Sequence, residues 1–426
     1  ASGNMLDQNG NQQHHISIQN SELSALLDAS QDGRQIDIGG TGVANIRLAN
    51  GELTAFTADF DGKLGATDVP KGRIRLQANG TPNDIHFNEL MYQGKAGHLD
   101  GTGRVQLGDN RLSWDIDAKL QDLDTGYFIA DNPTIITGKL DSQGSWIKGK
   151  TKAETGQLGD FTAKFAGQVD TDKLPAGNLL VDIKGNAQVI DINRLYHDGD
   201  AGKLDAKGTL DMRQGYQWQI NTEMNNFNLG YFVKDMPSRL SGHLNSIGSW
   251  QTDSQHVQIQ DMNISGQLKG QPFKAQGAIN VQMQLPKDIK GYLNRLKSEN
   301  TYNQYGQINA MIDTLQADNL VIRWADNYLT VTGDKQQLQA KVNIINLNQL
   351  DPRLNGEVSG GMSMLQTTDN HLPTLYVDVL ARRLALPNLL LASGHVKGKL
   401  VDLGNSPSQL TVQAVDLETA NQQINQ

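Results

Sequence analysis

Apolar and polar residues alternate along most of this chain with a period of two. Between Phe273 and Met283 the odd positions carry apolar residues or glycine, and nearly all even positions are polar. The same alternation runs through Trp114–Gln121, Trp218–Met224 and Leu338–Ile344. Successive side chains of a strand point to opposite faces, so this period predicts strands with one apolar and one polar face. Strands buried on both faces would read as continuous apolar runs, so we expect a largely antiparallel sheet with one solvated side.

An internal repeat of 104 to 105 residues contains these strands. Residues 126–146 align without a gap on residues 230–250, and 11 of the 21 positions are identical. A looser third copy places Pro352 and Gly356 where Pro133 and Gly138 stand in the first. A unit of this length holds about seven strands. No Pro/Ser-rich linker separates the copies, which favours solenoid-like stacking over a duplicated globular β-domain.

The repeat divides the chain into six expected segments. They are a polar start with a short helix (1–30), leading strands (31–71), repeat unit 1 (72–176), repeat unit 2 (177–284), a helical insertion (285–304) and a looser, truncated repeat unit 3 (305–426). Ser21–Asp28 predicts the short helix, with Asn20 or Ser21 as its cap. From Leu285 to Ser298, a proline at the first helical position and an apolar stripe favour an amphipathic helix, although a strand matching the repeat pattern stays open.

Composition restricts how the apolar face can be covered. Hydrophobic residues make up 37% of the 426 residues and aromatic residues 6%, while 44 residues are glycine. A large two-sided core is therefore not expected, because aromatic residues are few and glycine exceeds its usual share of about 7%. About 28 strands of ordinary length with few helices must hide their apolar face. Either two sheets form a sandwich, or one long sheet curls about its axis so that its apolar face lines a groove. We expect the curled, all-β arrangement with one or two short helices.

The candidate groove residues share the apolar parity of their strands, and we expect them to line one continuous interior. They are Trp114, Ile116, Leu120, Trp218, Ile220, Met224, Phe273, Ile279, Val281, Met283, Leu338, Val342 and Ile344.

Catalytic and metal chemistry is not expected. The chain has no cysteine, and its nine histidines are scattered apart from the adjacent pair His14-His15, whose side chains on a strand would point to opposite faces. We therefore expect no catalytic residue, no metal and no cofactor, and hence no enzyme. The net charge of −9 comes from scattered acids, which argues against a nucleic-acid partner. The longest nearly apolar run, Leu384–Ala392, is too short to span a bilayer, and no signal peptide is visible, so we expect a piece of a longer protein.

Several segments resemble the degenerate strand repeat of the TamB family, in the wider AsmA-like superfamily, and the resemblance covers roughly residues 30–417. The segments that carry it are Leu123–Leu140, Phe227–Leu244, Ile264–Val281, Ala325–Gly333 and Leu350–Gly360. The resemblance implies a taco-shaped β-groove in the periplasm, with no catalytic residues to carry over. It also implies an N-terminal inner-membrane anchor and an outer-membrane partner of the TamA type, both reached through regions that we expect to be absent from this chain.

These features are compatible with three functions. The first is a conduit in which phospholipid acyl chains slide along the groove between the inner and outer membranes, which spares an exposure cost of about 0.8 kcal/mol per CH2 group. The second is an assembly factor that adds strands of outer-membrane or autotransporter proteins to a sheet edge. The third, a surface β-helix adhesin, is disfavoured because a β-helix repeats at every short rung. A continuous stack of about 28 strands would form a rod of roughly 130 Å.

Overall fold

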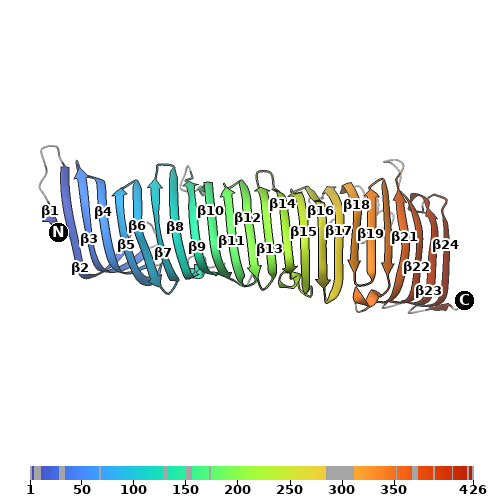
Figure 1. Ribbon diagram of the computed structural model, residues 1–426. Coiled ribbons are helices and arrows are strands. Elements are labelled where there is room, and N and C mark those ends of the chain that lie inside the picture. Colours follow the sequence, from blue (N-terminus) through green and yellow to red (C-terminus); the bar gives the residue numbers. More distant parts are fainter. Residues whose placement is uncertain are drawn as a thin grey trace. The chain divides into compact units, whose positions relative to one another are not determined.

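The computed structural model describes residues 2–3, 11–27, 34–66, 69–127, 133–149, 156–171, 174–284, 311–351, 353–366, 373–386, 389–404, 406–419 and 422–424. Strands make up most of the regular structure in these ranges (Figure 1). The chain divides into two compact units, Ala1–Lys207 and Gly208–Gln426. The boundary lies within β13 (Gly202–Asp211).

The first unit is an antiparallel sheet in which consecutive strands pair from β1 to β12 (Figure 1). A short 3-10 helix, η1 (Thr125–Tyr127), follows β8. The strands are β1 (Ser2–Gly3), β2 (Asn11–Leu27), β3 (Arg34–Ala49), β4 (Glu52–Ala66), β5 (Val69–Thr81), β6 (Asp84–Gly94), β7 (Gly97–Leu107), β8 (Arg111–Asp124), β9 (Ile135–Ile147), β10 (Gln157–Asp170), β11 (Gly177–Gly185) and β12 (Val189–Gly199).

The second unit repeats this plan, with consecutive antiparallel pairing from β14 to β25. Its 3-10 helices are η2 (Leu229–Tyr231), η3 (Leu347–Gln349) and η4 (Val401–Gly404). Its strands are β14 (Tyr216–Phe227), β15 (Ser238–Trp250), β16 (Ser254–Leu268), β17 (Gln271–Gln284), β18 (Ile312–Trp324), β19 (Asn327–Asp334), β20 (Gln337–Ile344), β21 (Asn355–Leu365), β22 (Thr374–Leu386), β23 (Leu389–Leu400), β24 (Gln409–Thr419) and β25 (Gln422–Ile424).

These pairings confirm the expected all-β, antiparallel fold. Short turns connect several of the strands: Asn50 and Gly51 join β3 to β4, both with positive φ (52° and 83°). Two successive residues of this conformation give the type I′ turn, whose twist matches that of the flanking strands.

The short helix expected over Ser21–Asp28 is wrong, because the backbone from Ser21 to Leu27 belongs to β2. Ser21 lies opposite Gly40 of β3, and Leu27 lies opposite Arg34. A helix of two turns is marginal in water, whereas pairing with a long neighbouring strand supplies backbone hydrogen-bond partners along the segment. The amphipathic helix expected within 285–304 lies outside the described residues.

Bulges keep the apolar residues on one face where the alternation slips. In β8 the register shifts between Leu120 and Leu123, and Asp122 takes a left-handed conformation with φ 50°. Its backbone N–H donates to Thr137 Oγ1 of β9 at 2.9 Å. The extra residue lets Leu120 and Leu123 face the same side although they are three positions apart.

The same bulge recurs 104 residues later, in β14. The register shifts between Met224 and Phe227, Asn226 has φ 51°, and its N–H donates to Ser241 Oγ at 2.9 Å. Asp and Asn are the residues besides glycine that adopt this conformation most readily. The sequence repeat therefore reproduces the local geometry of the sheet as well as its strands.

Candidate functional site

The candidate site is the apolar face of the sheet. Residues directly opposite each other in an antiparallel pair lie on the same face, so the register can be followed from strand to strand. In the first unit the row through Ile116 runs across β2 to β12. It consists of Ile16, Ala44, Ala58, Ala78, Phe87, Gly103, Ile116, Ser142, Ala163, Ile183 and Ile192.

A neighbouring row on the same face, from β3 to β12, contains only apolar residues and glycine. Its members are Gly42, Phe60, Leu76, Leu90, Gly101, Ala118, Leu140, Phe165, Val181 and Leu195. Neither row contains a charged residue. Ser142 is the single polar member of the two.

The second unit presents the same kind of face. The row through Ile220 runs from β14 to β23: Ile220, Ser246, Ile259, Ile279, Ala317, Gly333, Leu338, Met364, Leu375 and Leu400. The row through Met224 continues to β24 without a polar side chain: Met224, Gly242, Ile264, Ala275, Ile322, Leu329, Val342, Gly360, Val379, Val396 and Val412.

The register places the sequence-predicted residues on this face in their own unit. Trp114 and Ile116 are two positions apart in β8, and Ile220, Ile279 and Leu338 share one row. Trp218 and Val281 share another, through Gly248 and Val257. The remaining predicted residues have the same parity within their strands: Leu120, Met224, Phe273, Met283, Val342 and Ile344.

Most of these side chains remain partly open. Of the 13 predicted residues, Leu120 is buried at 8% exposure and Ile116 is 36% exposed, while the other eleven lie between the buried and exposed classes. Val257 and Met362, on the same face, are 41% and 43% exposed. A closed core would bury such residues, so this face keeps accessible apolar surface.

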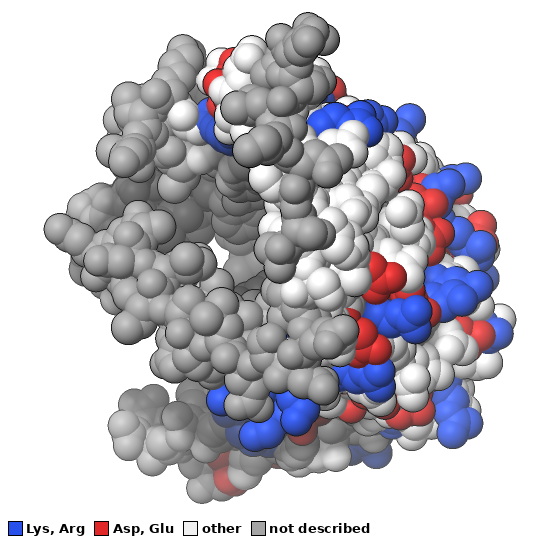
Figure 2. Space-filling view, turned by 90° about the vertical axis from the view of Figure 1, so that its left-hand side faces the viewer, with Lys and Arg blue, Asp and Glu red and all other residues white. Residues whose placement is uncertain are grey.

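The opposite face carries the charged groups. Arg73 donates to both carboxylate oxygens of Asp61, at 2.9 and 2.7 Å, and Arg104 pairs with Asp84 at 2.7 and 2.5 Å. Hydrogen bonds from these guanidinium groups lower the pKa of Asp61 and of Asp84 below the ordinary 3.8. Figure 2, seen from the end where the chain begins, shows Lys, Arg, Asp and Glu interspersed over the described surface.

The two polar members of the apolar rows are tied to tryptophans. Trp114 lies opposite Gly144, and its Nε1–H donates to Ser142 Oγ at 3.0 Å. In the second unit Trp218 lies opposite Gly248, and its Nε1–H donates to Ser246 Oγ at 3.0 Å. We call each set of tryptophan, serine and glycine a tryptophan rung. Sequence reasoning missed the serines and glycines of the rungs, although the spacing of 28 residues from tryptophan to serine is the same in both copies.

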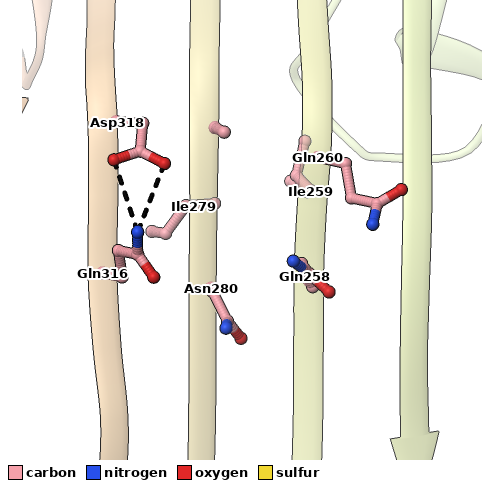
Figure 3. A pocket seen from close by; sticks show the side chains of 8 residues that line it. Gln258, Ile259, Gln260, Ile279, Asn280, Gln316 and Asp318 are labelled. Atoms are coloured by element: carbon pink, nitrogen blue, oxygen red, sulfur yellow. Dashed lines mark hydrogen bonds between the residues drawn. The ribbon is translucent and has the colours of Figure 1, made fainter.

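A small cavity of about 200 Å³ lies along β16, β17 and β18 (Figure 3). Gln258, Asn280 and Gln316 line it and lie opposite one another, on the polar face beside the row through Ile220. Gln316 Nε2 donates to Asp318 at 3.4 and 3.5 Å. Ile259 and Ile279, which belong to the row through Ile220, also line the cavity, so it borders the apolar row as well as these polar residues.

Within the described ranges, no group of three or more His, Asp or Glu side chains is placed to hold a metal ion. In that same part of the chain, no helix has the length and apolar character needed to cross a membrane.

Comparisons of the sequence with known proteins found relatives. The family model for the N-terminal domain of TamB matches residues 8–155 and 153–426. A relative from Haemophilus influenzae, named translocation and assembly module subunit TamB, is 26% identical over 267 residues. That match covers 62% of this chain and 18% of the relative, so the chain spans only a fraction of the relative's length. No solved structure matches the chain.

Proposed function

The chain belongs to the TamB family, and we propose from this membership and from its uncharged face that it is part of a phospholipid conduit of the cell envelope. In this proposal acyl chains lie along the apolar face and head groups remain in water. The chain acts as a passive surface and not as an enzyme.

The observation that carries the proposal is the run of rows without a charged residue. The rows through Ile116 and Ala118 in the first unit, and through Ile220 and Met224 in the second, contain apolar residues, glycine and one serine per unit. An acyl chain moved through water exposes apolar surface at about 0.8 kcal/mol per CH2 group, or on the order of 10 kcal/mol for a chain of ordinary length. The accessible apolar face, which we call the wall, removes most of that cost.

The wider setting is also part of the proposal. We propose that the full-length protein is periplasmic, is anchored in the inner membrane, and meets an outer-membrane protein of the TamA type. The name of the Haemophilus influenzae relative, a subunit of a translocation and assembly module, supports a partnership of this kind.

Lipid analysis of the purified protein tests the conduit directly. We expect native mass spectrometry, and thin-layer analysis of an organic extract, to detect phospholipid bound to the chain. Protein that carries no lipid, even after incubation with phospholipid vesicles, would contradict the proposal. Cross-links between a sheet edge and an unfolded outer-membrane strand, with no lipid bound, would instead favour assembly by strand addition.

A further inference from the structure

We propose that the tryptophan rungs, Trp114–Ser142–Gly144 and Trp218–Ser246–Gly248, are acyl-chain binding subsites, one in each unit. The ligand is the hydrocarbon chain of a phospholipid, which contacts the exposed face of the indole ring. This inference rests on the proposed function and adds the residues at which the wall binds its ligand.

The indole ring of each rung packs directly on the rung's glycine, which we call the seat of the ring. A Cβ atom added at Gly248 would lie 2.2 Å from Trp218 Cζ2, and one added at Gly144 would lie 2.4 Å from Trp114 Cζ2. Real Cβ atoms essentially never come so close to another heavy atom, so the ring rests on backbone that only glycine leaves bare. The indole therefore lies across the neighbouring strand and adds a flat apolar surface to the wall.

The serine of each rung satisfies the one polar group of the indole. An unpaired N–H facing an apolar ligand would lose its hydrogen bond to water without compensation. Ser142 and Ser246 accept that hydrogen bond at 3.0 Å, and they are the only polar side chains in the four rows followed above. Because its N–H is already paired with the serine, the tryptophan presents apolar surface to the ligand.

The pairing of these polar groups favours an acyl chain over an extended peptide. A peptide brings backbone N–H and C=O groups that need partners when they leave water. The backbone groups of the wall already pair between strands, and the indole N–H of each rung already donates to its serine. A hydrocarbon chain needs no such partner, so the wall matches it without cost.

Repetition supports a role beyond local packing. Tryptophan, serine and glycine each recur at an offset of 104 residues, although 10 of the 21 aligned positions of residues 126–146, which include the serine and the glycine, differ between the copies. In both copies the side chains also form the same contact.

Bromine quenching tests the contact. Vesicles of phosphatidylethanolamine and phosphatidylglycerol with brominated acyl chains would load the protein, and bromine quenches an indole only when it touches it. We expect the double variant Trp114→Phe/Trp218→Phe to lose the larger part of the quenching. The comparison is the double variant Trp146→Phe/Trp250→Phe, which removes tryptophans of the same face that lie two positions beyond the rung glycines, at strand ends, where they are 43% and 57% exposed. If the acyl chain binds at the rungs, this variant should retain the larger part of the quenching.

A second measurement tests the seat. Gly248→Ala should push the indole of Trp218 off the wall and lower lipid bound per protein about fourfold, the change expected when contact worth roughly one CH2 group is lost. The control is Gly361→Ala on the polar face, where an added Cβ meets its nearest atom at an ordinary 3.5 Å.

The outcomes separate this inference from the proposed function. Wild-type protein that binds no lipid would contradict both. Lipid that binds wild type while Trp114→Phe/Trp218→Phe is quenched as strongly as wild type would overturn the subsites and leave the conduit intact. Equal lipid content in Gly248→Ala and Gly361→Ala would overturn the seat, and displacement of the lipid by an extended peptide would overturn the acyl assignment. Loss of quenching with loss of lipid in Gly248→Ala alone supports the rungs.

Discussion

At single residues, the two faces of the sheet satisfy polar groups in different ways. On the polar face, exposed guanidinium and carboxylate groups pair across strands, as Arg194 does with Asp205 at 2.7 Å. Such exposed pairs contribute little to stability, because water screens them. On the apolar face, the indole N–H of Trp218 donates to Ser246 Oγ at 3.0 Å. Arginine–aspartate pairs therefore lie on the polar face, whereas a hydroxyl satisfies the indole N–H on the apolar face.

A charge placed on the apolar face should block lipid binding without unfolding the protein. Ile220 is half-buried, so Ile220→Asp should lower the free energy of unfolding by about 1 kcal/mol, roughly half of the value of a fully buried side chain. Lipid bound per protein should fall to background, because the carboxylate holds water in the path of the acyl chains. Gln219→Asp, on the exposed face of the same strand, is the control and should keep its lipid. Equal lipid content in the two variants would contradict a wall role for Ile220. Val281→Arg should behave as Ile220→Asp does.

The Asp211–Arg213 pair should show a strongly acidic carboxyl. Hydrogen bonds from the side chain and the backbone N–H of Arg213 lower the pKa of Asp211 from 3.8 to about 2. Because the pKa is lowered on folding, the pair favours the folded state above pH 3.8, and this contribution is lost as the pH falls through about 2. NMR titration of labelled aspartate carboxyls should place Asp211 near 2 and return it toward 3.8 in Arg213→Ala. A midpoint that Arg213→Ala leaves unchanged would show that the pair does not set the pKa.

At the level of elements, bulges explain how strands of 12 to 14 residues keep one apolar face. The bulge at Asn226 absorbs one residue, so that Met224 and Phe227 both face the apolar side. Its repeat equivalent at Asp122 does the same for Leu120 and Leu123. A strand without this device would turn every residue beyond the slip to the wrong face.

The bulge at Asn226 should therefore depend on its left-handed backbone. Asn226→Ala should lower the free energy of unfolding by about 1 kcal/mol. The left-handed conformation costs an L-residue roughly 1–2 kcal/mol, and alanine lacks the short polar side chain that lets asparagine adopt it. Asn226→Gly should be neutral or stabilising. Urea unfolding followed by circular dichroism measures both. Equal losses in the two variants would point to the side chain of Asn226 and not to its φ of 51° as the source of stability.

The length of the whole molecule remains a prediction from sequence. A continuous stack of about 28 strands spaced by about 4.8 Å gives a rod of roughly 130 Å, with a radius of gyration of about 38 Å. A compact globule of the same length would have a radius of gyration of about 22 Å. We expect small-angle scattering of the purified chain to give the larger value. A value near the smaller one would mean that the repeats fold as separate compact domains.

The alternation of residues determined the strands and their two faces. Each side chain's face follows from its parity, which is local, so Trp114, Ile220 and Val342 could be assigned to the apolar face without knowing their neighbours. The repeat added that the same strands recur after 104 residues. The resemblance of several strand motifs assigned the chain to the TamB family, and the family model confirms this. Each motif is weak alone, but many of them in a fixed order are specific together.

Only the tertiary structure decided which residues meet. Strand hydrogen bonds join positions far apart in sequence, so pairing of Leu23 with Ile38 made β2 a strand where a short apolar run predicted a helix. For the same reason the sequence alone could not show that Ser142 accepts the hydrogen bond of Trp114, 28 residues away. That contact depends on the register of β8 against β9, which bulges and turns set together.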